Sequence, residues 1–160
     1  MKKIFLLALS SVVCMACSNI SNTNTVDSSA VERSASNLLT FNSNYNFTET
    51  KNKIITALQA KNMTIFSQID HQAAAEKAGL NMQPASVIIF GTPKIGTPYM
   101  VKDPKFALEL PLKVLVTEVD GKVQVVMKNT KSLLSDSQIE YSEIKDTLGK
   151  AELLIEKAIK

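Results

Sequence analysis

Residues 112–127 read LKVLVTEVDGKVQVVM, two runs rich in β-branched residues joined by Asp120-Gly121. An Asp-Gly pair between such runs is a strong short-range signal for a β-hairpin, because both residues accept the positive φ of a type I′ turn. The sequence therefore predicts two antiparallel strands, one over residues 112–119 and one over residues 122–127.

Three more segments have the composition of strands. Residues 87–90 are continuously apolar, as is typical of a buried central strand, and the run stops at Gly91. Residues 63–69 alternate between apolar and polar side chains, with a break in the alternation at Phe66. Residues 38–43 are predicted to form the first strand. The sheet then has four or five strands.

Two helices are predicted in the first half of the chain. Residues 47–60 place apolar side chains on one face, and Thr48 is the expected capping residue. A short alanine-rich helix over residues 71–78 is capped by Asp70 and ends at Gly79, where a positive φ is favoured.

Two more helices are predicted in the second half. One has Thr97 as its cap and Pro98 at its first helical position, and continues from residue 99 to about residue 108 with an interruption near Asp103-Pro104. The other is a C-terminal amphipathic helix over residues 139–160, which Gly149 is expected to interrupt. Its apolar stripe comprises Ile144, Leu148, Ala151, Ile155 and Ile159.

These strands and helices do not alternate regularly, and the Asp-Gly hairpin requires at least one antiparallel pair. We therefore expect the α+β class, a two-layer sandwich with a mixed or antiparallel sheet of four or five strands and helices packed on it. Residues 38–160 are long enough for one apolar core, so they are predicted to form a single domain.

The N-terminus has the pattern of an export signal. Lys2 and Lys3 precede a mostly apolar stretch over residues 4–16. This stretch is shorter than the ~20 residues of a membrane-spanning helix, which favours a cleaved signal peptide over residues 1–16. Export to the cell envelope follows.

The sequence around Cys17 resembles a bacterial lipoprotein signal, with a small residue before the cysteine and a polar stretch after it. Cys14 occupies the position where such signals usually carry Leu. We expect lipid on Cys17, with residues 17–37 as a flexible tether to the membrane. Ser18 favours the outer membrane if the organism has two. The alternative is an ordinary secreted protein, cut near Ala16, in which Cys17 is a free thiol.

Charge and cysteine content limit the classes of partner that we expect for this protein. The formal net charge is +3, and removal of the signal peptide leaves +1, with lysines interspersed among acids, so nucleic acid is not an expected partner. The two cysteines lie in or beside the signal, and the one histidine has no companions at ligand spacing. We expect no disulfide framework, no metal and no cofactor.

Two groups of residues are candidates for a functional site. Asp70 and His71 are the one adjacent acid and histidine, and they are weak catalytic candidates, since Asp and His at a helix start also act as plain caps. The segment 91–98 is predicted as a glycine-containing loop that either binds a ligand or consists of two tight turns. Its candidate ligand-binding residues are Gly91, Thr92, Pro93 and Lys94, with Tyr99 beside them.

Five motifs occur in order: residues 69–80, 88–93, 96–100, 107–114 and 120–123. Together they resemble the bacterial family called domain of unknown function 302 (DUF302), over residues 38–129. The resemblance implies an α+β fold that commonly forms dimers, and it implies no biochemical activity. The family's Phe-Gly-Asn-Pro motif appears here with Thr92 in place of Asn, so a carboxamide is missing.

Three functions remain open. The favoured one is a non-enzymatic envelope lipoprotein that binds a small ligand or a protein, as a possible homodimer. The second is an enzyme that uses Asp70, His71 and the segment 91–98. The third is an interaction module that docks a partner through the C-terminal helix, which requires its apolar stripe to be exposed.

Overall fold

The structure is a computed structural model, and it describes residues 36–160. The predicted signal peptide, Cys17 and most of the predicted tether lie outside the described residues. Within the described part, no helix is both long and apolar enough to cross a bilayer.

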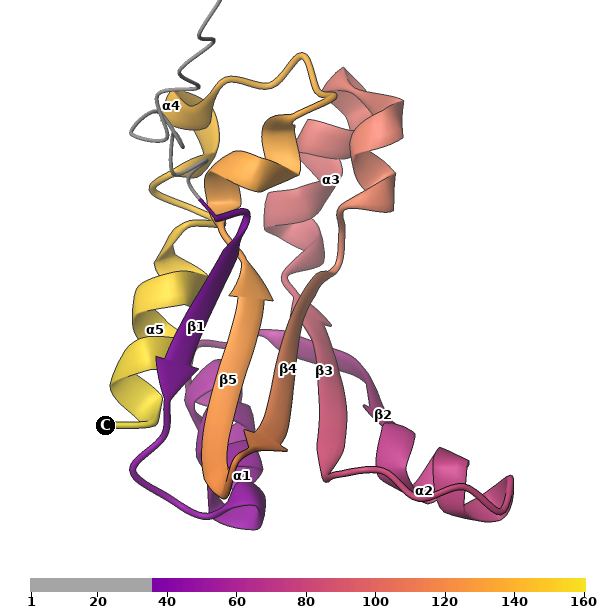
Figure 1. Cartoon of the computed structure of the whole chain (residues 1–160). Helices are drawn as coiled ribbons and strands as arrows, with labels where there is room; N and C mark the ends of the chain where they lie inside the picture. Colours follow the sequence, from indigo (N-terminus) through magenta and orange to yellow (C-terminus); the bar gives the residue numbers. More distant parts are fainter. Residues whose placement is uncertain (1–35) are drawn as a thin grey trace, which may run out of the picture. The chain divides into compact units, whose positions relative to one another are not determined.

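A five-stranded antiparallel sheet forms the centre of the domain, as Figure 1 shows. The hairpin strands β4 and β5 lie in its middle, and the order across the sheet is β1-β5-β4-β3-β2. This confirms the predicted α+β class. The strands are β1 (Leu38–Asn42), β2 (Thr64–Asp70), β3 (Ala85–Gly91), β4 (Leu112–Val119) and β5 (Lys122–Lys128).

The hairpin has the predicted turn. Asp120 and Gly121 have φ values of 51° and 71°, and Val119 pairs with Lys122 across them. Two positive φ values in succession define the type I′ turn, whose twist matches the flanking strands. Gly79, the predicted helix stop, likewise has a φ of 74°.

Helices pack on one face of the sheet. In Figure 1, α1 and α5 lie behind the strands, and they also contact each other. The helical elements are α1 (Phe47–Ala60), α2 (His71–Lys77), α3 (Pro93–Lys102), α4 (Tyr141–Ile144) and α5 (Lys150–Ala158), with short 3-10 helices η1 (Pro104–Leu108) and η2 (Thr130–Leu134).

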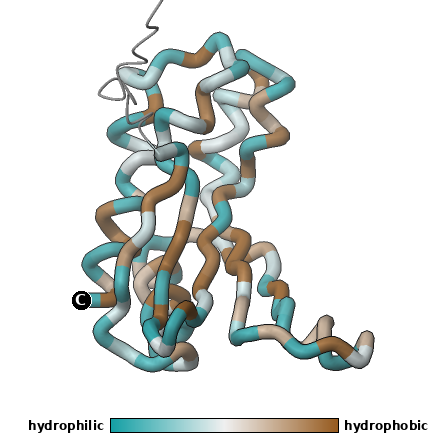
Figure 2. Tube along the Cα trace, viewed as in Figure 1, coloured by the Kyte–Doolittle hydropathy of each residue, from teal (hydrophilic) through white to brown (hydrophobic). Residues whose placement is uncertain are grey.

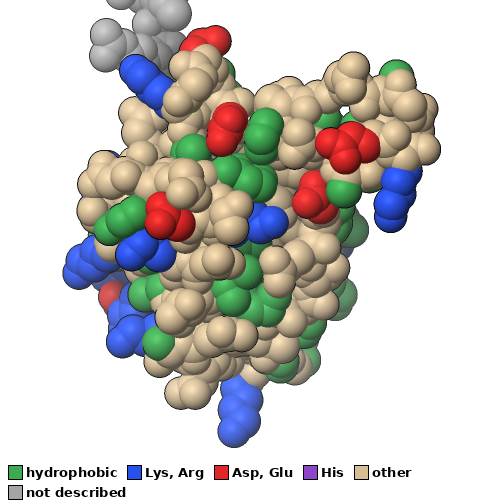
Figure 3. Space-filling view, turned by 90° about the horizontal axis from the view of Figure 1, so that it is seen from below, with side chains coloured by type: hydrophobic (Ala, Val, Ile, Leu, Met, Phe, Trp, Pro, Cys, Tyr) green, Lys and Arg blue, Asp and Glu red, His purple; other side chains and the backbone are tan. Residues whose placement is uncertain are grey.

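The core lies between the sheet and these helices. Alternate residues of the three central strands are buried there, as the period of two in a strand requires. Figure 2 shows hydrophobic residues recurring along the strands. The opposite face, called the open face below, is uncovered by helices of the described part in Figure 1, and its apolar side chains are half-buried. At the lower end of the domain, acidic and basic side chains are interspersed with hydrophobic ones (Figure 3).

Several predicted details were wrong. The N-cap of α1 is Asn46, whose side chain accepts a hydrogen bond from the Glu49 N–H at 2.9 Å, and not Thr48. The helix predicted to begin at Pro98 begins at Pro93, so the segment 91–98 is a strand end followed by a helix. The C-terminal helix is divided into α4 and α5, with Gly149 next to the break as expected.

Candidate functional site

The candidate pair Asp70 and His71 lies at the end of β2. The Asp70 carboxylate accepts a hydrogen bond from the Ala73 N–H at 3.0 Å and so caps α2, and both side chains are exposed. Asp70 pairs with Ser86, whereas Thr64 at the other end of β2 pairs with Gly91. The two ends are six residue steps apart along β2, a distance of about 20 Å. The structure therefore does not bring Asp70 and His71 together with the segment 91–98.

The segment 91–98 turns directly from β3 into α3. Pro93 is suited to the first helical position because it lacks an N–H. Thr92 precedes it as the N-cap, without a side-chain cap hydrogen bond. Gly91, Thr92 and Pro93 line a small pocket of about 90 Å³ together with Phe66, Gly96, Met100, Leu110, Pro111, Leu112 and Leu148. Ligand sites typically have volumes of about 300–1,000 Å³, so this pocket accommodates only a very small group.

The two remaining candidates of this segment lie outside that pocket. Lys94 is exposed. The Tyr99 hydroxyl donates to the Glu143 carbonyl at 2.9 Å and lies 2.8 Å from the Thr147 hydroxyl. Its ring packs edge-on against Phe106. Tyr99 therefore joins α3 to the segment that carries α4.

A larger hollow, which we call the open-face groove, occupies the open face of the sheet. Its volume is about 350 Å³. Val87, Leu115 and Val126 lie on its floor as neighbours on β3, β4 and β5, because Leu115 pairs with both of the others. The remaining apolar lining is Leu38, Leu108, Leu112, Met127 and Leu133.

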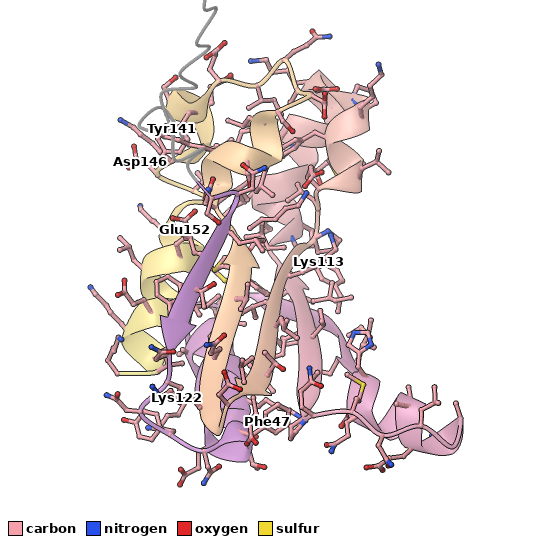
Figure 4. The ribbon with its side chains drawn as sticks, in the orientation of Figure 1. Phe47, Lys113, Lys122, Tyr141, Asp146 and Glu152 are labelled. Carbon is pink, nitrogen blue, oxygen red and sulfur yellow. The ribbon has the colours of Figure 1, made fainter. Side chains whose placement is uncertain are left out.

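Three charged side chains belong to this groove. Lys128 donates to the Glu109 carboxylate at 2.7 Å, with 52% and 29% of the two side chains exposed. Lys113 donates to the Pro111 carbonyl at 3.1 Å and lies at the upper end of the sheet in Figure 4. The pairing of β4 with β5 ends at Val114 and Met127, and Lys113 and Lys128 are the residues next to that last pair. The groove thus combines an apolar floor with two ammonium groups and one carboxylate.

Sequence reasoning missed the open-face groove. The available signal in the sequence is the continuous apolar run 87–90, which predicts a strand buried on both faces of the sheet. In the structure, Val87 and Ile89 on the open face are only half-buried. The groove also needs Leu108 from η1 and Leu38 from β1, which are far apart in sequence. Local patterns do not reveal such a juxtaposition.

The apolar stripe of the predicted C-terminal helix is part of the core. Its five members, Ile144, Leu148, Ala151, Ile155 and Ile159, are each at most 9% exposed. They belong to the same core cluster as Ile54 and Leu58 of α1, and their burial removes the exposed stripe that docking through this helix requires. The docking hypothesis in that form is wrong.

Comparison with known proteins gives both a fold and a family. The crystal structure of an uncharacterized conserved DUF302 protein from Bacillus stearothermophilus matches with a TM-score of 0.59 and 16% identity. The match covers 78% of this chain and 94% of that one. At this identity the likeness shows the fold alone.

Curated relatives match over a shorter stretch. A segment of 90 residues, 56% of this chain, is 36% identical to proteins named fluoride-specific ion channel FluC 1 in Brucella suis and Brucella abortus. It covers 35% and 33% of those proteins, so the chain spans about a third of their length.

The model of the domain of unknown function DUF302 matches residues 39–160. The match extends past the 38–129 of the sequence resemblance, so the family domain includes α4 and α5. Since the match covers most of the chain, this protein belongs to the DUF302 family.

Proposed function

We propose that this protein is a membrane-tethered binding protein of the cell envelope, which holds a small ligand in the open-face groove without transforming it. The observation that carries the proposal is the groove itself. Its volume of about 350 Å³ is within the range of ligand sites, and eight of its eleven lining residues are apolar.

The arrangement of the candidate residues favours binding over catalysis. An enzyme needs its acid, its base and its substrate pocket to converge. Asp70 and His71 are exposed and lie about 20 Å along β2 from the segment 91–98. The open-face groove contains Lys113, Lys128 and Glu109, which recognise charge, and its other lining residues are unreactive aliphatic side chains.

The membrane tether is supported by the sequence. The signal pattern before Cys17 and the polar stretch after it are those of a lipoprotein. In addition, the Brucella relatives contain the matching segment within proteins named as ion channels, so a similar segment is attached to a membrane protein there. Fluoride conduction is not carried over, because the match covers about a third of those proteins.

Native mass spectrometry of the protein purified gently from its own host tests the binding function. We expect a defined non-covalent adduct that is lost from Leu115→Gln, which places an amide on the groove floor. The matched control is Leu153→Gln, because Leu153 is a 59% exposed leucine on α5. An adduct that persists in Leu115→Gln, or a protein that stays empty in host extract, would overturn the proposal.

A further inference from the structure

We propose that the ligand of the open-face groove is a free fatty acid, a single acyl chain that ends in a carboxylate. The inference rests on the proposed function of the groove and specifies its ligand. The carboxylate binds Lys128 and Lys113, and the acyl chain lies on the aliphatic floor beside them.

The first argument is the shape of the floor. The groove extends from Leu38 on β1 to Val87 on β3, across β5 and β4. Three strand spacings give a length of about 14 Å. The groove volume of about 350 Å³ is within the range of small-ligand sites and suits a single acyl chain. Aliphatic side chains without hydrogen-bonding groups suit such a chain.

The second argument is charge. Lys113 and Lys128 both line the groove, next to the last pair between β4 and β5, and Glu109 neutralises Lys128. The Lys113 ammonium group has a backbone carbonyl as its partner. An anion beside these two lysines therefore gains charge-assisted hydrogen bonds from two donors.

The third argument is that Glu109 is replaceable. Its ion pair with Lys128 is partly exposed, and exposed pairs contribute little to stability. A ligand carboxylate offers Lys128 the same chemistry that Glu109 offers. It also brings an acyl chain that buries the groove floor, so exchange of one carboxylate for the other is favoured. Glu109 is then a competitor of the ligand.

The fourth argument is the position of the chain that precedes the domain. Leu38 lines the groove, and the backbone just before it is held by Asn129, which donates to the Ser36 carbonyl at 2.7 Å. Only about 20 residues of sequence separate this point from Cys17, where the lipid is predicted. A lipid on Cys17 would therefore keep the groove near a bilayer, whose lipids carry acyl chains.

The test measures displacement of a dansyl-labelled undecanoate from a chain that begins at Ser18. This chain contains the whole apolar core, since the buried hydrophobic residues lie between Ile54 and Ile159. Dodecanoate should displace the probe, whereas dodecanol and dodecyltrimethylammonium, which have the same chain without the anion, should do so at least about tenfold less well.

Three variants locate the site. Lys128→Gln and Lys113→Gln should each weaken dodecanoate binding about tenfold, and Glu109→Gln should strengthen it several-fold, because it removes the competing carboxylate. Lys157→Gln, at an exposed lysine of α5, is the matched control and should change nothing. Thermal melts check that each variant is folded.

Each contrary result has a definite meaning. Equal displacement by dodecanoate and dodecyltrimethylammonium, or weaker binding in Glu109→Gln, overturns the inference. If the protein carries a host-derived adduct that dodecanoate fails to displace, the ligand is not a fatty acid. The proposed binding function of the groove is then still supported. Retention on anionic phospholipid vesicles without binding of free dodecanoate shows that the face docks on a lipid surface, and this also overturns it.

Discussion

Gly149 is a position where the chain leaves no room for a larger residue. A Cβ added to Gly149 would lie 2.5 Å from the Lys145 carbonyl oxygen, although the φ of Gly149 is an ordinary −63°. Space, and not backbone freedom, is what this position requires. A Cβ on Gly91 would meet its nearest neighbours at 3.6 and 3.7 Å, which is normal van der Waals contact.

We therefore expect Gly149→Ala to lower the free energy of unfolding by ~1–3 kcal/mol, the usual cost of overpacking. Gly91→Ala is the matched control, and its effect should stay within ~1 kcal/mol. Urea denaturation of both variants measures the difference. Equal stability of Gly149→Ala and the unsubstituted protein would contradict the steric explanation.

Asp103 is a second residue with a specific structural role. It is 4% exposed, and its carboxylate accepts hydrogen bonds from the Gln138 N–H at 3.0 Å and the Ser137 hydroxyl at 2.8 Å. The hydrogen bond from Gln138, followed by that from Ser137, lowers the pKa of Asp103 below its ordinary value. The ionised form is therefore favoured in the folded protein.

The lowered pKa of Asp103 gives a pH dependence with a definite sign. The stabilisation is complete above the unfolded-state pKa of ~3.9 and is lost as pH falls through the lower folded-state pKa. Asp103→Asn should reduce the melting temperature clearly at about pH 7, and the difference should shrink towards about pH 2. Melting curves across this range check it, and a difference that grows in acid would contradict it.

At the scale of elements, α3 is joined to the α4 segment by polar contacts. Tyr99 bonds to the Glu143 carbonyl and to Thr147, and Lys102 contacts both oxygens of the Glu143 carboxylate at 2.7 Å. The hydrogen bond from Lys102 and that from the Glu140 N–H lower the pKa of Glu143. These contacts hold α3 against the segment that carries α4.

Tyr99→Phe should cost about 1 kcal/mol of unfolding free energy, because it removes the hydroxyl that two partners use. Binding in the open-face groove should not change, since Tyr99 does not line it. Tyr141→Phe is the control, because Tyr141 is 40% exposed. Chemical denaturation together with the dansyl-undecanoate assay separates the two effects, and a loss of binding in folded Tyr99→Phe would place Tyr99 in the site.

Elements with local signals were predictable. The hairpin is indicated by the adjacent pair Asp120-Gly121, and α2 is indicated by Asp70 just before it and Gly79 just after it. The segment 91–98 was predicted wrongly because Pro93 and Pro98 both suit a first helical position, and Gly96 resembled a turn residue. In the structure Gly96 is buried, and a Cβ there would lie 3.2 Å from Leu110, so this glycine permits close packing of α3.

At the scale of the whole molecule, the predicted lipid determines where the protein is held. Cys17→Ser removes the acceptor thiol, so we expect the protein to move from the membrane fraction to the soluble exported fraction and to lose its acyl mass. Cys14→Ser is the matched control and should retain both, because Cys14 lies within the predicted signal. Unchanged fractionation of Cys17→Ser would favour the free-thiol alternative.

The last prediction concerns assembly, which the family resemblance suggested as a homodimer. β2 is an edge strand whose residues 64–69 include no lysine, arginine or proline, and its guard against pairing between chains is the register shift between Ile65 and Ser67. Phe66 and Ile69 on this strand are 49% and 40% exposed. We expect two copies to associate along β2, and we expect Ile69→Lys to give monomers, because it places a charge on the edge.

Val101→Lys is the control, since Val101 is 76% exposed and belongs to α3, not to β2, and it should leave the dimer intact. Light scattering during gel filtration measures the mass in each case. If the unsubstituted protein is a monomer, the prediction of a dimer is wrong. A dimer that survives Ile69→Lys would place the contact elsewhere, and the half-buried open face would then have to be tested by blocking the groove with dodecanoate.

Because the groove and the β2 edge involve different residues, ligand binding should be unaffected in Ile69→Lys, so assembly and binding are separable by experiment.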